Sequence, residues 1–426
     1  MDTLENNISL IESFCGIDVY LIKTNKFKTN TVNIFFHDVL DEERATKNAL
    51  IPAVLRRGCQ KLPTYQDIAL YLEELYGTVF DCGVAKKGER QLMHFYMEFL
   101  ADIYADSDDS LFQKAFEVIF EIITQPVLEN GMFKEDYLKQ EKENLRKLIE
   151  SRINDKVQYA VDRCYEEMCK GEPFSVYEYG SVAQLEEIGN KDLYDYYKTC
   201  IETLPMQVFL TGNISDDNIR FALKKLKSIK RRNLKELSLL NIKSEIQKVR
   251  EVTEKMDVNQ GKLSLGFRTN IFPGDKEYYP LALYTSILGG GIHSKLFQNV
   301  REKQSLAYYI FSRQEIFKGL LLVSCGIEIE NKEKAVKIII EQVEEIKRGN
   351  ISDYEYESAL KTMETGVRSL QDSQIQMVDF FVSQIAANTK DNFETLIEKL
   401  RKVTKQDIIK VAEKVQLDTI YFLTSK

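Results

Sequence analysis

The sequence predicts an α+β protein made of two copies of a two-layer domain, each an antiparallel-rich sheet with helices on one face. Three observations predict this class. The 426 residues are enough for two or three domains. Each half of the chain runs from strands to long helices to a last strand, an order typical of α+β domains. The two halves also share blocks of the same layout, which indicates a duplication.

The repeat consists of three blocks that occur in the same order at nearly constant offset. The first block is one long helix and the start of another, and its copies are displaced by 218 residues. The second block is displaced by 215 residues, and each half then closes with an apolar strand. The paired blocks begin at Phe133 and Ile351, at Val182 and Ile397, and at Gln207 and Thr419. We therefore expect two domains of about 200 residues each, residues 1–235 and 236–426.

Hydrophobic patterning places the remaining elements of each half. In the first half it predicts paired strands at 19–24 and 31–38, a helix near Ala49, a helix at 65–75, and strands at 78–85 and 91–99. In the second half it predicts a strand at 262–269, a helix at 279–288, and a strand pair at 306–313 and 319–329. Between the halves, the basic stretch 219–255 is expected to be a solvated linker.

Composition excludes several classes of function. The net charge of −8 disfavours nucleic acid and anionic lipid as partners, and no apolar run reaches the length of a membrane span. The N-terminus lacks the pattern of a secretory signal. Seven scattered cysteines without a C-x-x-C pair indicate reduced thiols, so we expect a cytoplasmic protein.

The most specific motif is the run LGGGIHSKLFQNVREKQSLAYYIFS, which covers 288–312. It resembles the second domain of the pitrilysin-like (insulinase-type) zinc peptidases, a family that includes the mitochondrial processing peptidase. Twelve ordered positions match the family's run of a Gly-rich turn, Leu-Phe, Arg-Glu and Leu-Ala-Tyr. They are Gly289, Gly290, Gly291, Ser294, Leu296, Phe297, Arg301, Glu302, Lys303, Leu306, Ala307 and Tyr308. His293 departs from the small residue that is usual there.

Active members of that family carry an inverted zinc motif, H-x-x-E-H, and a further Glu ligand about 75 residues on. The three histidines of this chain, His37, His94 and His293, are too far apart to form the motif in any register. Alignment on Gly58 and on Glu141 puts Ala49, Pro52, Ala53 and Leu148 at the four zinc-site positions. The resemblance therefore implies an inactive homologue with no cofactor of its own. Proline inside a helix also predicts that the former zinc helix starts late or kinks.

The other half of the family's composite active site is present. In the family, an Arg and a Tyr of the second domain reach toward bound peptide, and here they are Arg301 and Tyr308. The resemblance implies a non-catalytic subunit that supplies these two residues, while a zinc-bearing homologue supplies the metal. An extended peptide would be the substrate, and it would add as a strand to a sheet edge. One bacterial branch with such a subunit is associated with modification of elongation factor P, and this sequence is similar to it.

Two other readings stay open. The chain could be a structural scaffold, in which case Arg301 and Tyr308 serve only surface pairing and sheet packing. It could also be a homodimeric peptide-binding protein without a peptidase partner.

Overall fold

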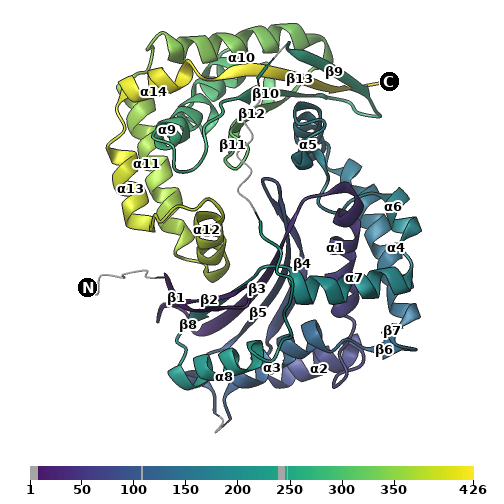
Figure 1. Ribbon diagram of the computed structural model, residues 1–426. Helices are drawn as coiled ribbons and strands as arrows, with labels where there is room; N and C mark the ends of the chain where they lie inside the picture. The colour runs from purple at the N-terminus through teal and green to yellow at the C-terminus, as the bar shows by residue number, and fades with distance from the viewer. Residues whose placement is uncertain (1–7, 107–108, 238–244, 247) are drawn as a thin grey trace. The chain divides into compact units, whose positions relative to one another are not determined.

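The computed structural model describes residues 8–106, 109–237, 245–246 and 248–426 (Figure 1). The residues form two compact units, each with many contacts within itself. Unit 1 comprises Met1–Ser151, Val176–Ser238 and Gln374–Phe381, and unit 2 comprises Arg152–Ser175, Leu239–Ser373 and Val382–Lys426. Each unit therefore includes a segment from the other half of the sequence.

Unit 1 is built on a six-stranded sheet in the order β1-β2-β8-β3-β5-β4. The strands are β1 Ile8–Phe14, β2 Ile17–Lys23, β3 Thr29–Val39, β4 Val79–Lys87, β5 Arg90–Leu100 and β8 Met206–Gly212. The strands predicted in this half are all present, but the predicted pairing of the first two is wrong. Strand β8 lies between β2 and β3, parallel to β2 and antiparallel to β3.

The helices of unit 1 gather along one side of this sheet (Figure 1). They are α1 Glu42–Leu55, α2 Tyr65–Glu74, α3 Leu111–Thr124, α4 Glu135–Ser151, α6 Val182–Glu187, α7 Asn190–Thr203 and α8 Asp216–Leu226. A small hairpin, β6 Leu128–Glu129 and β7 Met132–Phe133, precedes α4. Apolar side chains of α1, α3 and α7 form one buried core with those of β3 and β5. Burial of this apolar surface is the main force that holds the two layers together.

Unit 2 repeats the same topology. Its five strands lie in the order β11-β12-β10-β13-β9 and are β9 Arg250–Lys255, β10 Gly261–Arg268, β11 Ala307–Glu315, β12 Leu320–Ile327 and β13 Gln416–Thr424. Strands β9 and β13 are parallel, as β2 and β8 are in unit 1, and the other neighbours are antiparallel. Read from the parallel pair outward, this order matches unit 1 without its extra strand β1. The predicted duplication and the α+β class are thus confirmed.

The helices of unit 2 are α5 Lys156–Met168, α9 Tyr278–Gly289, α10 Lys332–Lys347, α11 Asp353–Leu370, α13 Phe393–Arg401 and α14 Lys405–Ala412. Helix α5 comes from the first half of the sequence, yet it packs on β10 and β13. Its counterpart α12, Gln374–Ala386, starts 218 residues later, and its first eight residues group with unit 1. The two halves therefore exchange equivalent helices.

Buried ion pairs fix the exchanged segment to unit 2. The ammonium of Lys318, whose side chain is fully buried, lies 2.7 Å from a carboxylate oxygen of Glu172. Arg268 joins the same carboxylate at 3.1 Å and pairs with Asp418 at 2.7 Å. Removal of one partner from a buried ion pair costs about 3–5 kcal/mol. Loss of any one of these four side chains would therefore destabilise the packing of the exchanged segment on unit 2.

The described parts of the basic stretch 219–255 are not a solvated linker, contrary to the prediction: they include the end of α8, strand β9 and a segment, 227–237, that contacts unit 1, while residues 238–244 and 247 lie outside the described residues. The guanidinium of Arg231 donates to the carbonyl of Ile201 at 2.6 Å, and Arg232 pairs with Glu202 at 2.7 Å. Lys227 pairs with Glu12 at 2.6 Å. These three cations therefore contact unit 1. Across the described part of the chain, no helix is both long and apolar enough to cross a bilayer.

Candidate functional site

Helix α1 carries three of the four positions where active relatives hold zinc. Asp41 caps its N-terminus by accepting a hydrogen bond from the backbone N–H of Glu43 at 3.0 Å. The helix then runs unbroken to Leu55, so the predicted late start is wrong. Pro52 lies in the last turn, where the helix continues because the N–H of Arg56 donates to the Pro52 carbonyl at 3.0 Å. Proline has no N–H, so position 52 donates no bond to the carbonyl of Asn48, yet the helix continues to Leu55.

Gly58 supports the alignment that assigns these positions. A Cβ atom at Gly58 would lie 2.3 Å from the carbonyl oxygen of Pro63, so only glycine fits at this turn. The zinc-site alignment anchored on this glycine stays a prediction. It puts Ala49, Pro52 and Ala53 at the metal-binding positions.

The fourth position, Leu148, lies on α4, and its side chain is 42% exposed. Earlier on α4, the buried carboxylate of Glu141 forms an ion pair with Arg57 and accepts a hydrogen bond from the Asn144 amide at 3.2 Å. This ion pair connects α4 to the end of α1. The two helices that supply zinc ligands in active relatives are thus joined here by a salt bridge.

The residues at these positions do not fit a zinc ion. Zinc is bound by thiolate, imidazole or carboxylate groups, and alanine, proline and leucine side chains have no lone pair to donate. Among the described residues, no group of three or more His, Cys, Asp or Glu side chains is placed to hold a metal. No catalytic step through zinc can be assigned to this chain.

The histidines lie elsewhere and are not arranged for catalysis. His37 is buried on β3. This burial is the main reason that the pKa of its imidazole is lowered to about 3. His94 stacks on Phe35 at 4.2 Å between ring centres, and its Nε2 is 2.9 Å from the Asn33 amide oxygen. Burial lowers its pKa to about 4. Both rings are neutral and pack within the sheet.

The glycine run at the end of α9 permits close packing in unit 2. A Cβ at Gly289 would lie 2.5 Å from the backbone nitrogen of Ser312, and one at Gly290 would lie 2.6 Å from the Cα of Ser286. The end of α9 can therefore approach β11 directly. This approach fixes the start of the segment that carries Arg301 and Tyr308.

Arg301 lies on η4, Phe297–Glu302, a short π-helix. Such turns are rare and often occur at functional sites. The Arg301 side chain is 43% exposed. Its guanidinium sits 4.8 Å from the centre of the Phe297 ring, and its Nε lies 3.8 Å from the Glu302 carboxylate. Both contacts are weak at an exposed position, so the guanidinium is accessible to a ligand.

Tyr308 follows at the start of β11, an edge strand of the unit 2 sheet. The pairing of β11 with β12 shifts register between Ala307 and Tyr309, so Tyr308 is the extra residue of a β-bulge. Bulges redirect side chains and are common beside active sites. Tyr308 is 52% exposed, and its hydroxyl donates to Glu328. This hydrogen bond raises the pKa of the phenol, which stays protonated. To donate to a ligand, its one hydrogen has to turn away from Glu328.

The structure brings Arg301 and Tyr308 to adjoining elements of the same unit. The N–H of Leu306 donates to the carbonyl of Val300 at 3.1 Å, which ties the end of η4 to the start of β11. The zinc-site positions, in contrast, belong to unit 1.

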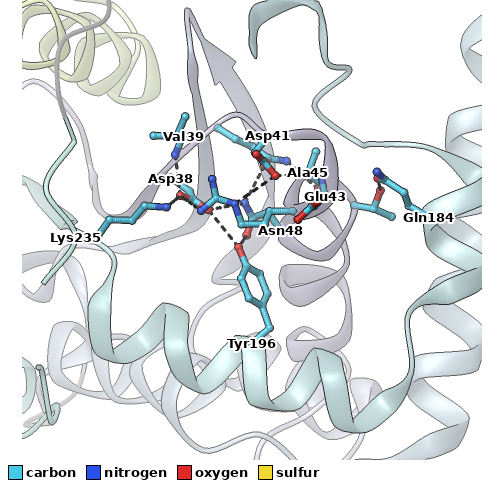
Figure 2. Close-up of polar contacts among 12 residues, drawn as sticks. Asp38, Val39, Asp41, Glu43, Ala45, Asn48, Gln184, Tyr196 and Lys235 are labelled. Carbon is cyan, nitrogen blue, oxygen red and sulfur yellow. Dashed lines mark hydrogen bonds and ion pairs between the residues drawn. The ribbon is translucent and has the colours of Figure 1, made fainter. Parts of the chain in front are cut away.

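A polar cluster that the sequence analysis missed lies at the start of α1 (Figure 2). Its centre is Asp38, whose side chain is only 2% exposed. Arg44 and Lys235 form ion pairs with this carboxylate, the former at 3.3 Å. The Asn48 amide and the Tyr196 hydroxyl donate to it at 3.3 and 3.1 Å. With every acceptor position engaged by cations and donors, Asp38 is structural.

The comparisons with known proteins agree with this geometry. Residues 187–363 match the family described as the peptidase M16 inactive domain. A probable inactive metalloprotease of Bacillus subtilis, YmfF, is 36% identical over 408 residues, which cover 96% of each chain. This chain belongs to the M16 peptidase family. It is a non-catalytic member, because the matched family model is the inactive domain and the relative that spans 96% of the chain is described as a probable inactive metalloprotease.

Two further relatives support the assignment of this M16 chain. A conserved protein of Enterococcus faecalis V583, of known structure, matches with a TM-score of 0.91 and 28% identity over 99% of both chains. An uncharacterized zinc protease of Bacillus subtilis, YmxG, is 26% identical over 221 residues, about half of each chain (51%). The resemblance to pitrilysin-type peptidases is therefore confirmed at the level of the family and its two-domain fold.

Proposed function

We propose that this M16 chain is the non-catalytic subunit of a two-chain zinc peptidase. A zinc-bearing homologue would supply the metal, and this chain would supply Arg301 and Tyr308 to bind peptide in a shared chamber. The observation that carries the proposal is the contrast between the two units. All four zinc-site positions are lost, whereas Arg301 and Tyr308 are present, exposed and placed on adjoining elements.

The chemistry of the two side chains suits this role. A guanidinium and a protonated phenol both donate hydrogen bonds to a peptide carbonyl. Beside a metal held by the partner, they would stabilise negative charge that develops on the carbonyl oxygen during hydrolysis. Neither residue needs to change its protonation state, because arginine stays charged and the raised pKa keeps Tyr308 protonated.

Considered by itself, unit 1 has a sheet edge that suits an extended peptide. Strand β4 is an edge strand with partly exposed residues, and it lies against the former zinc helix, where the Cys82 thiol contacts the Pro52 carbonyl. An extended peptide could pair with this edge through backbone hydrogen bonds.

The partner is proposed from the family. Bacillus subtilis has both a probable inactive relative of this chain and an uncharacterized zinc protease that matches half of it. We propose a heterodimer of this kind, with zinc held by the partner alone, in the cytoplasm. None of the seven cysteines forms a disulfide, which is consistent with a reducing compartment. A role beside elongation factor P modification stays a prediction.

The test is peptide cleavage by this chain mixed with the zinc-motif homologue of the same cell. Arg301→Ala should lower kcat/KM of the mixture by about 100-fold or more, the usual loss when one donor to a developing oxyanion is removed. Tyr308→Phe should lower it by about tenfold or more for the same reason. Lys303→Ala is the matched control, because Lys303 is exposed on the same turn and bonds only to Asn299 in the described chain.

Unchanged activity in both variants would contradict the proposed role of this pair. The scaffold account would then be preferred if the mixture is active, and the homodimeric peptide binder if the chain pairs only with itself.

A further inference from the structure

A lysine-lined hollow on unit 2, remote in sequence from Arg301 and Tyr308, has no role in the proposed peptidase. Its volume is about 480 Å³. Five lysines from three segments converge on it, together with two carboxylates and a partly apolar floor that includes Pro280, Val403 and Val411. The lysines are Lys276, Lys399, Lys402, Lys410 and Lys414. We call this site the lysine hollow.

Both carboxylates of the lysine hollow are already engaged. Glu277 pairs with Lys414 at 2.6 Å. Asp407 caps α14, where it accepts from the backbone N–H of Thr404 at 3.0 Å. The lining therefore carries three more positive than negative charges, on a chain whose net charge is −8.

Three of the five ammonium groups form no close ion pair in the described residues, although Glu277 and Asp407 attract Lys276 and Lys410 over a longer distance. Lys399 pairs with Asp391 and contacts the Tyr279 hydroxyl at 3.2 Å. Within the described residues, no carboxylate lies within ion-pair distance of Lys276, Lys402 or Lys410. Like charges held together destabilise a fold by a few tenths of a kcal/mol per neighbouring pair, so the cluster is not explained by stability.

Helix dipoles account for only part of the cluster. Lys399, Lys402, Lys410 and Lys414 lie at the C-terminal ends of α13 and α14, where cations are favourable. Lys276, however, comes directly before Glu277, the N-cap of α9, where a cation is unfavourable. An anion bound in the lysine hollow would compensate for Lys276 and for the two other unpaired lysines.

We propose that the lysine hollow binds a small anion that carries several clustered negative charges, of the polyphosphate type. Lysine ammonium groups bind phosphate as point charges, and groups from three segments suit a compact anion with two or more phosphates. The volume is within the usual range of small-ligand sites. This proposal does not depend on the peptidase role of Arg301 and Tyr308.

The test is calorimetric titration of the purified full chain with inorganic tripolyphosphate at low and at physiological ionic strength. The double variant Lys402→Glu/Lys410→Glu reverses two unpaired charges and should weaken binding about tenfold or more. The matched control is Lys334→Glu/Lys337→Glu, which makes the same change of net charge on exposed lysines of α10. The control should bind within about twofold of the unchanged chain, because α10 does not line the hollow.

Each alternative result contradicts the proposal in a distinct way. Equal weakening in both double variants would show that only net charge matters. Failure of tripolyphosphate to bind would exclude a polyphosphate site, and binding of octaglutamate instead would identify an acidic peptide as the ligand. Thermal unfolding verifies that the variants fold, and Lys402→Gln/Lys410→Gln replaces the first variant if its charge reversal prevents folding.

Discussion

His37 illustrates how single residues of this fold respond to burial. It lies in the middle of the unit 1 sheet with 2% of its surface exposed, and burial, together with the nearby charges of Arg90 and Lys87, lowers its pKa to about 3. In the unfolded chain its pKa returns to about 6.5. Between these values the unfolded state binds a proton that the folded state does not.

This difference predicts a loss of stability in mild acid. The contribution of neutral His37 to the free energy of unfolding is fully present above pH 6.5. It declines as the pH falls, with a slope of at most about 1.4 kcal/mol per pH unit. Denaturant unfolding at pH 5.0 and pH 6.5 should show this decline, and His37→Phe should reduce it. His94, whose pKa is lowered to about 4, and His293, whose pKa burial also lowers, contribute further slope. An identical pH dependence in the His37→Phe variant would contradict the assignment.

For single residues, the sequence was enough to exclude a type of site, but it did not predict which side chains contact one another. Three separated histidines were enough to exclude the zinc motif, because the motif needs two imidazoles on one helix face. The partners of Asp38 could not be found in this way, because Tyr196 and Lys235 are 158 and 197 residues away along the chain. The available signal was a carboxylate at the end of an otherwise apolar strand run.

The Asp38 cluster connects several elements of unit 1. It joins the end of β3 to α1 through Arg44 and Asn48, to α7 through Tyr196, and to the segment after α8 through Lys235. Removal of one partner from a buried ion pair is costly because the remaining charges lose their compensation. The cluster therefore fixes the N-terminal half of α1 without any metal.

Asp38→Asn should lower the free energy of unfolding of unit 1 by about 2–4 kcal/mol, a value reduced from the fully buried case because both cations are partly exposed. Asp192→Asn, which breaks the exposed pair with Lys47, should cost less than about 1 kcal/mol. Denaturant midpoints of the two variants check both values. A similar small loss in the two variants would show that the Asp38 cluster does not stabilise α1.

Among the elements, local patterns predicted most helices and strands but not their partners. Strands β2 and β3 follow each other in sequence, and such strands usually pair. Here β8 inserts between them from near residue 206, and nothing in the local pattern of β2 or β3 indicates this. The late start predicted for the helix that contains Pro52 was wrong for a related reason. Whether a proline lies near the start or the end of a helix depends on where that helix ends, and the local pattern did not specify this.

For the whole molecule, the duplication explains both what is shared and what has diverged. The two units keep one strand order and one parallel pair, although their sequences differ at most positions. The exchange of α5 and α12 was not predicted, because an amphipathic helix pattern does not specify the sheet on which the helix packs. The zinc positions of unit 1 have been lost, and the Arg-Tyr pair of unit 2 is present.

The most direct test of the account is zinc-dependent cleavage of a peptide library by this chain alone, by its zinc-motif homologue alone, and by the equimolar mixture. The account predicts no cleavage by this chain alone and strong cleavage by the mixture, abolished by a chelator. Chelator-sensitive cleavage by this chain alone would contradict the loss of its metal site. A mixture no more active than the homologue would contradict the composite peptidase.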